Sequence, residues 1–99
     1  MENNPYHVID DVLVVFNGGV QLYRREVESR LVDQNIIIEM PVIDSILDKL
    51  EEEKYLTIQE IKNYHTTGFS IDKKYKISYK GYILVNHEGG YYQKIKKGK

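Results

Sequence analysis

Residues 40–56 read MPVIDSILDKLEEEKYL and contain the clearest amphipathic pattern in the chain. Its aliphatic side chains recur at the spacing i, i+3, i+4, i+7, which gathers them on one face of a helix. They are Ile43, Ile46, Leu47 and Leu50. Pro41 suits the start of a helix, because its missing N–H would have no intrahelical partner there. The stretch therefore predicts a helix over residues 41–53 that leads into a strand beginning near Tyr55.

A first helix is expected over residues 5–17. An Asn-Pro pair opens this segment, and Asn can cap a helix while Pro fits its first turn. Gly-Gly at 18–19 follows it, and Gly readily adopts the left-handed conformation that closes a last turn. These two ends favour a helix, although residues 12–16 (VLVVF) are β-branched enough to form a strand.

A second helix is expected over residues 23–34, because Tyr23, Val27 and Leu31 lie four residues apart. Residues 20–22 alternate in polarity and predict a short strand before it. The helical and strand periods together predict a common core. Its members are Val12, Phe16, Val27, Leu31, Ile43, Ile46, Leu47, Leu50, Ile77 and Ile83.

The C-terminal half of the chain predicts a hairpin over residues 55–78. One strand is rich in β-branched and aromatic residues, and the other alternates apolar with polar residues. Gly, Ser and Asp between them predict a loop of about ten residues over 65–74. A short last helix is expected over 79–88, either capped by Ser78 or beginning at Gly81. Residues 1–92 are then one domain, and 93–99 a disordered Lys-rich tail.

Composition narrows the class of function. A chain of 99 residues without cysteine suits one domain and excludes disulfides, thiol chemistry and zinc–thiolate sites. The three histidines have no metal-ligand spacing, and no serine has the surroundings of a catalytic nucleophile. We therefore expect a non-enzymatic, cytoplasmic protein with no cofactor, no metal and no small-molecule ligand. The N-terminus does not resemble a secretory signal, and no apolar run is long enough to cross a membrane.

The net charge of −1 conceals a strong asymmetry along the chain. Residues 1–72 contain 6 Lys and Arg against 14 Asp and Glu, a net charge of −8. Residues 73–99 contain 8 Lys against a single acid, Glu88, a net charge of +7. Such a distribution can orient a charged partner, and it is also typical of a tail that keeps a protein soluble.

The order of the expected elements resembles the winged-helix family, a variant of the helix-turn-helix. Residues 43–56 (IDSILDKLEEEKYL) are similar to the family's third helix running into its strand, and residues 75–84 (YKISYKGYIL) to its last strand and helix. Residues 19–36 are similar to the approach to its second helix. The chain is also similar to small bacterial winged-helix proteins that end in Gly-Gly-Tyr, here at 89–91.

This resemblance implies an α+β fold with a three-helix core, a C-terminal β-hairpin wing and a short final helix. Members of the family usually bind duplex DNA, as transcription regulators do, with the third helix in the major groove and the wing on the backbone or minor groove. The resemblance implies a set of nucleic-acid contacts, with a homodimer as a possible assembly. These residues are Arg24, Arg25, Arg30, Ser45, Lys49, Lys73, Lys74, Lys76 and Lys80.

The charge of the third helix supports an alternative. Residues 39–54 contain 6 acids and 2 lysines, and DNA repels an acidic surface. Other winged helices are protein-interaction modules, so this helix could contact a basic protein or a second copy of the chain. Nine tyrosines suit either a small core or an interface. The residues of this alternative surface are Asp44, Asp48, Glu51, Glu52, Tyr91 and Tyr92.

Overall fold

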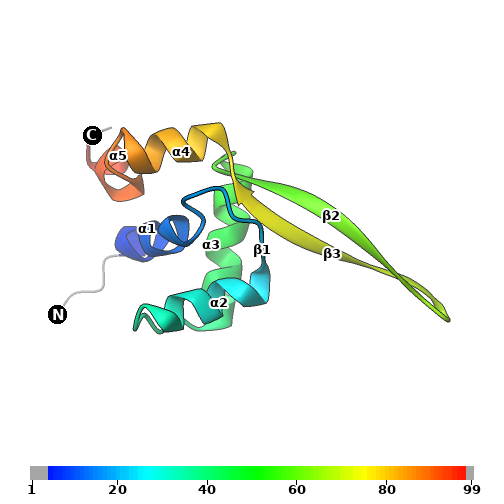
Figure 1. The fold of residues 1–99 in the computed structure, drawn as a ribbon. Coiled ribbons are helices and arrows are strands. Elements are labelled where there is room, and N and C mark those ends of the chain that lie inside the picture. The colour runs from blue at the N-terminus through cyan, green and yellow to red at the C-terminus, as the bar shows by residue number, and fades with distance from the viewer. Residues whose placement is uncertain (1–4, 98–99) are drawn as a thin grey trace.

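The structure, a computed structural model, describes residues 5–97 as five helices and a three-stranded antiparallel sheet (Figure 1). The elements along the chain are α1 (Pro5–Val15), β1 (Leu22–Tyr23), α2 (Arg24–Asp33), α3 (Met40–Glu52), β2 (Leu56–His65), β3 (Gly68–Ile77), α4 (Tyr79–Asn86) and α5 (Tyr91–Lys97). The expected α+β class, the three-helix core and the hairpin wing are confirmed.

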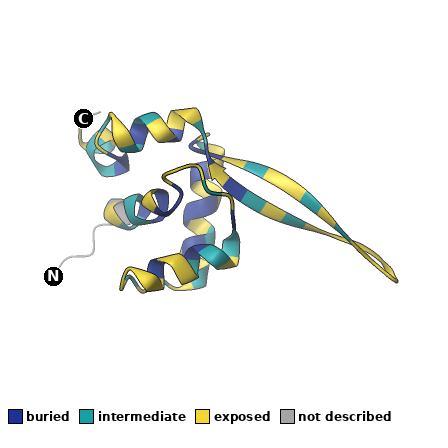
Figure 2. Cartoon of the chain, in the orientation of Figure 1, coloured by how far each residue is buried: buried dark blue, intermediate teal, exposed yellow. Residues whose placement is uncertain are grey.

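The core lies where α1, α2 and α3 meet the base of the hairpin (Figure 2). Nine of the ten predicted core residues are buried, and Ile83 is only half-buried. Ser78 caps α4 by accepting a hydrogen bond from the Gly81 N–H, so α4 starts at Tyr79 and turns Leu84 toward the core. The prediction that Ile83 belongs to the core was therefore wrong by one residue, because Leu84 takes that place.

The wing is longer and tighter than its sequence predicts. Residues 65–74, expected as a loop, mostly belong to the two strands, which pair from Leu56↔Ile77 out to His65↔Gly68. Only Thr66 and Thr67 remain in the turn. Gly68 has φ of +141°, which other residues rarely adopt, and this permits the tight reversal. Backbone pairing thus overrides the polar composition on which the loop prediction relied.

The wing extends well beyond the helices and makes the molecule elongated, with dimensions of 52 × 29 × 22 Å (Figure 1). At the base of the wing, β3 is hydrogen-bonded on both edges. One edge pairs with β2 along its whole length, and the other pairs with β1 through Leu22↔Tyr75 and Tyr23↔Lys74. Tyr75 is buried at this base, while most residues of the outer half are exposed (Figure 2). The helices therefore support the wing only at its base.

The expectation of a disordered tail is corrected for residues 93–97, which lie in α5. The carboxylate of Asp10 in α1 accepts hydrogen bonds from the Tyr91 and Tyr92 backbone N–H groups at the start of α5, the second at 3.1 Å. Gly90 has φ of +97° and lies so close to Asp10 that a Cβ would come within 2.7 Å of its carboxylate. The Gly-Gly pair therefore folds α5 back onto α1, a contact 81 residues apart that local sequence cannot show.

Replacing Asp10 with alanine should release α5. Hydrogen bonds to a charged group contribute about 1.5–3 kcal/mol each, and we expect a net loss of about 1–3 kcal/mol in the free energy of unfolding. Urea denaturation measures this loss. Limited trypsin digestion should also cut faster at the lysines of α5.

Asp11→Ala is the matched control, because Asp11 is the neighbouring half-buried acid of α1. Burial and the adjacent charge of Asp10 raise the pKa of Asp11, so its removal relieves repulsion. Equal stability of the two variants, with equal trypsin cleavage, would show that Asp10 does not hold α5.

Candidate nucleic-acid interface

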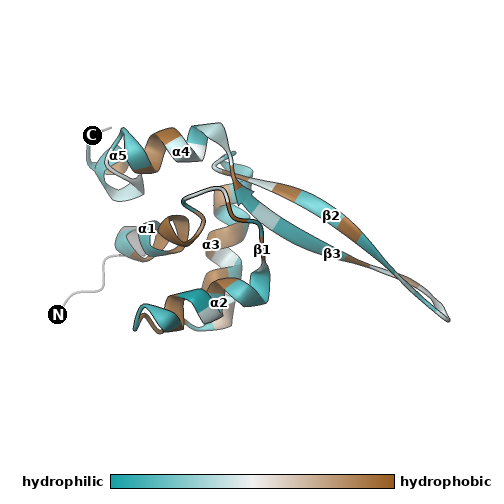
Figure 3. Ribbon diagram, in the orientation of Figure 1, coloured by the Kyte–Doolittle hydropathy of each residue, from teal (hydrophilic) through white to brown (hydrophobic). Residues whose placement is uncertain are grey.

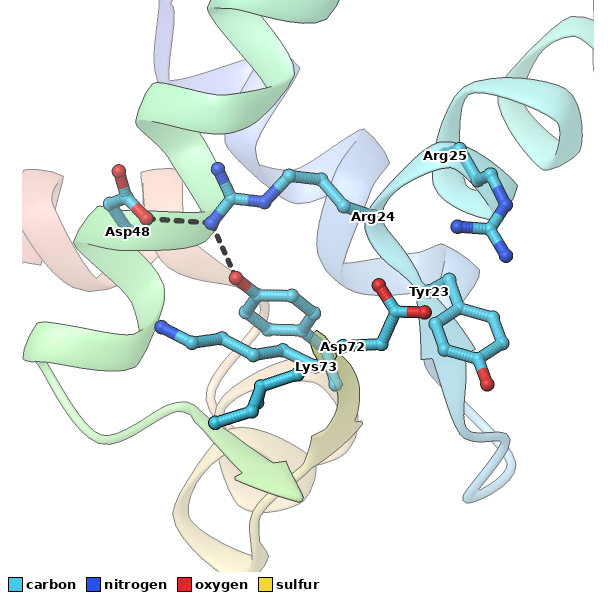
Figure 4. Close-up of a pocket in the computed structure, with 8 residues that line it drawn as sticks. Tyr23, Arg24, Arg25, Asp48, Asp72 and Lys73 are labelled. Atoms are coloured by element: carbon cyan, nitrogen blue, oxygen red, sulfur yellow. Dashed lines mark hydrogen bonds and ion pairs between the residues drawn. The ribbon is translucent and has the colours of Figure 1, made fainter. Parts of the chain in front are cut away.

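Arg24 neutralises part of the acidic third helix. Its guanidinium extends from the first turn of α2 to α3, where Nη2 lies 2.8 Å from Asp48 Oδ1 and Nη1 lies 3.1 Å from Asp44 Oδ1 (Figure 4). The Asp48 contact is a hydrogen bond, whereas Asp44 Oδ1 has only ion-pair distance and no hydrogen-bond partner among the described residues. Nη2 also donates to the hydroxyl of Tyr75.

The surroundings of Arg24 keep it charged. Partial burial lowers its pKa, but hydrogen bonds to Tyr75 and Asp48 outweigh that effect and place the pKa above the ordinary value. Arg24, α3 and β3 are thereby held in one arrangement, so the third helix and the base of the wing have a fixed relative position. This internal role is added to the phosphate contact predicted for Arg24, which stays a prediction.

The third helix remains acidic after Arg24 has paired with Asp44 and Asp48. Adding Arg24 to residues 39–54, which have a net charge of −4, leaves −3. Glu51 and Glu52 are exposed at the end of the helix and form no ion pair among the described residues. Any attraction for nucleic acid must therefore come from the basic residues around α3.

A basic cluster, Arg25, Tyr23, Lys74 and Lys76, is assembled by α2 and the wing. The Arg25 guanidinium carbon lies 4.5 Å from the centre of the Tyr23 ring, and the Lys74 Nζ lies 4.8 Å from the same centre. Tyr23 and Lys74 are directly paired across β1 and β3, so they point to the same face of the sheet. Lys76, two residues further along β3, is exposed on that face.

Lys73 points to the opposite face of β3. Together with Arg24, Asp48 and Tyr75 it lines a crevice of about 450 Å³ between α2, α3 and the wing (Figure 4). The wing lysines at 73, 74 and 76 are near neighbours in the sequence, but Lys73 lines the crevice while Lys74 and Lys76 belong to the basic cluster. Tyr23 and Arg25 of the cluster also line the crevice. The sequence predicted Tyr23 at the start of the second helix and not among the contacts, but it lies in β1. Only the pairing of β1 with β3 reveals its position between two cations.

Three other predicted contacts are engaged in local structure. Lys80 lies on α4, not on the wing, and its Nζ donates to the Glu53 carbonyl at 2.8 Å, capping the end of α3. The Lys49 ammonium pairs with the Glu53 carboxylate at 3.2 Å, and this hydrogen bond raises the pKa of Lys49. Ser45 donates to the Pro41 carbonyl of its own helix. All three side chains are nevertheless exposed.

The remaining predicted residues lie away from the crevice. Arg30 is exposed in the last turn of α2. Tyr91 is buried, and its hydroxyl lies 2.9 Å from the Glu53 carboxylate. We expected Tyr91 to be an accessible contact residue, but it is part of the core. Burial and this hydrogen bond raise the pKa of Tyr91. Tyr92 is half-buried, with its ring edge-to-face against His7.

Three solved structures have the same arrangement of helices and strands as this chain. A PadR-like transcription factor from Bacteroides fragilis matches with a TM-score of 0.70 at 14% identity, over 95% of this chain and 87% of that one. A PadR family transcriptional regulator from Eggerthella lenta matches with a TM-score of 0.67 at 16% identity, over 92% and 76%. A PadR family transcription regulator from Clostridium difficile matches with a TM-score of 0.65 at 16% identity, over 89% and 91%. The chain has a winged-helix fold.

No family model and no curated protein matches the chain. Within residues 5–97, no three His, Asp or Glu side chains are grouped so that they could hold a metal ion. Over the same residues, no helix has the length and apolarity needed to span a bilayer. The candidate site consists of α3, the crevice and the basic cluster.

Proposed function

We propose that this winged helix binds duplex DNA and acts, without catalysing a reaction, as a module of a transcription regulator. The observation that carries the proposal is the basic cluster of Arg25, Tyr23, Lys74 and Lys76, which lies on the wing and beside the start of α2. Arg25 and Lys76 are exposed and Lys74 is half-buried, and Tyr23 and Arg25 also line the crevice that Asp48 of α3 borders. In this fold DNA is bound along the third helix and the wing. The three structures of the same fold are described as transcription factors or regulators, which supports the proposal.

The charges of the site determine how strongly the protein should bind DNA and how the affinity should depend on sequence and salt. Arg25, Lys73, Lys74 and Lys76 supply the attraction to phosphate, while Glu51 and Glu52 on α3 oppose it. Phosphate contacts position a protein without reading sequence, and acidic side chains read only cytosine among the bases. We therefore expect binding that is weak, largely independent of sequence and strongly dependent on salt.

A fluorescence anisotropy titration of a labelled random duplex tests this expectation. Four phosphate contacts give a slope of about −3.6 for log K against log salt concentration, so affinity should fall roughly 100-fold between about 50 and 200 mM salt. Absence of binding at the lower salt concentration would refute the proposal. A slope near zero would exclude the lysines as the source of affinity.

A second candidate function is a protein contact made by the acidic end of α3. Glu51 and Glu52 favour it, because both are exposed and unpaired among the described residues. The partner would be a basic protein or a second copy of this chain, whose own net charge between residues 73 and 99 is +7.

Replacing both Glu51 and Glu52 with Gln separates the two functions, because the expected effects have opposite signs. DNA affinity should rise when repulsion is removed, whereas association with a basic partner should weaken and its on-rate should fall. Self-association is measured by sedimentation velocity beside the DNA titration. Asp44 and Asp48 are less suitable for this test, because they hold Arg24 in place.

A further inference from the structure

The outer half of the wing exposes three large apolar side chains. Tyr64 is 79% exposed, Phe69 55% and Ile71 50%, far from the helical core. Tyr64 is directly opposite Phe69, and Lys62 is directly opposite Ile71. Directly opposite residues point to the same face, and side chains two apart on a strand share a face, so all four lie on one face of the tip. Figure 3 shows hydrophobic residues along the wing beyond the helices.

Packing within the hairpin does not account for this exposure. The Tyr64 and Phe69 ring centres are 6.4 Å apart with their planes tilted by 53°, and the Lys62 Nζ lies 4.7 Å from the Phe69 ring centre. Such cross-strand pairs stabilise a hairpin by about 0.2–1 kcal/mol each. The pair nevertheless leaves more than half of each residue in water, and an exposed apolar strand is prone to aggregation.

The reach of the wing matches the spacing of DNA grooves. Phe69 is six residues from Tyr75, the buried residue at the base of the wing, and six residues of strand extend about 20 Å. Adjacent major and minor grooves are separated by half a turn, about 17 Å along the duplex axis. With α3 in a major groove, the tip therefore arrives at the neighbouring minor groove.

We infer that the wing tip inserts Phe69, with Tyr64 beside it, into the minor groove and unstacks one base step. This inference rests on the proposed DNA binding. Apolar side chains that enter the minor groove separate neighbouring base pairs and kink the duplex. Lys62 stands over the inserted ring, where its ammonium neutralises a phosphate at the edge of the groove.

Charge favours a duplex over a protein as the occupant of the tip. Residues 56–77 contain four lysines, at 62, 73, 74 and 76, against two acids, Glu60 and Asp72, so the hairpin is net positive. Asp72 accepts a hydrogen bond from Asn63 at 3.0 Å, which turns this carboxylate into the hairpin. An apolar tip carried by a basic arm is complementary to a narrow, electronegative groove with stacked bases inside it. Flexible pyrimidine–purine steps, above all TA, should be preferred, because they unstack at the lowest energetic cost.

The test uses duplexes that carry 2-aminopurine beside a single central TA step, because the fluorescence of this base rises when it is unstacked. The wild-type protein should raise the fluorescence severalfold and bring dyes on the two duplex ends closer together. The double variant Tyr64→Ser with Phe69→Ser should lose both signals and bind roughly 10-fold more weakly, as expected for loss of base–aromatic stacking. Its salt slope should change by no more than about 0.9, because only the Lys62 contact to phosphate depends on the inserted ring.

Tyr79→Ser is the matched control, because Tyr79 is 80% exposed on α4 and lies outside the wing. It should leave both signals intact. Circular dichroism and thermal melting verify that the tip variant is folded.

The outcomes separate this inference from the proposed function. Wild-type binding with the expected salt slope but no rise in fluorescence overturns the wedge and leaves DNA binding in place. Failure of the wild-type protein to bind any duplex overturns both. If the tip variant instead loses self-association in sedimentation and keeps its DNA signals, the tip contacts a second copy and the wedge is wrong.

Discussion

Replacing Leu47 with alanine should lower the free energy of unfolding by about 2–5 kcal/mol. Leu47 is 0% exposed in the middle of α3, where the helices meet the base of the wing. Its removal leaves a cavity that the surrounding side chains cannot close. A domain of this size is stable by only about 5–15 kcal/mol, so the loss is a large share of the total. Urea denaturation monitored by circular dichroism measures it.

Val42→Ala on the same helix is the control for Leu47, because Val42 is 44% exposed. Alanine is the better helix former, so this change should shift stability by less than about 0.5 kcal/mol. A loss below about 1 kcal/mol for Leu47→Ala would place that side chain outside the core.

Introducing a single methyl group at Gly81 should be comparably damaging. A Cβ at this position would lie 2.3 Å from the Tyr55 carbonyl oxygen and 2.8 Å from Ile77 Cγ1. The first atom belongs to the backbone, so α4 must move away from the start of the hairpin. Gly81→Ala should therefore cost about 3 kcal/mol, near the upper end for overpacked cores. Thermal and urea denaturation both measure the loss.

Tyr79→Ala in the first turn of α4 is the control for Gly81, since Tyr79 is largely exposed. This variant should unfold like the wild-type protein. Helix propensity alone favours alanine over glycine by about 1 kcal/mol, so a stabilised Gly81→Ala variant would show that the close approach is absent.

Local periodicity was enough to predict the helical core. The spacing of Ile43, Ile46, Leu47 and Leu50 has one physical meaning, because only a helix brings the four side chains to one face. The predicted start at Pro41 is within one residue of the observed helix, Met40–Glu52. The four-residue spacing in α2 was informative for the same reason, because Val27 and Leu31 are both buried. The predicted cap of α1 at Asn4 lies outside the described residues.

Long-range contacts could not be predicted in this way. α5 forms because Asp10 accepts hydrogen bonds from backbone groups some 80 residues away, and nothing in the sequence of the Lys-rich tail indicates it. The full length of the two wing strands was not predicted, because they contain Gly, Ser and Asp, which are typical of loops. Hydrogen bonding between the two strands determines the structure of this segment.

The candidate site was predicted as a set of charges but not as an arrangement. The predicted charge of α3 did not include Arg24. Its ion pairs with Asp44 and Asp48 depend on the packing of α2 against α3, which the sequence does not show. The lysines at 73 and 74 were grouped together, although strand alternation sends them to opposite faces. A period-2 reading extended through residues 68–77 would have separated them.

The most direct test of DNA binding compares two charge reversals of equal size. Lys73→Glu with Lys74→Glu changes the wing, and Lys96→Glu with Lys97→Glu changes exposed positions on α5, at the other end of the molecule (Figure 1). Each pair takes the net charge from −1 to −5, because each replacement changes it by two. In anisotropy titrations of a random duplex at low salt, the wing pair should abolish binding, while the α5 pair should weaken it only a few-fold. Equal losses from the two pairs would contradict a DNA site on the wing, because net charge alone would then explain the affinity.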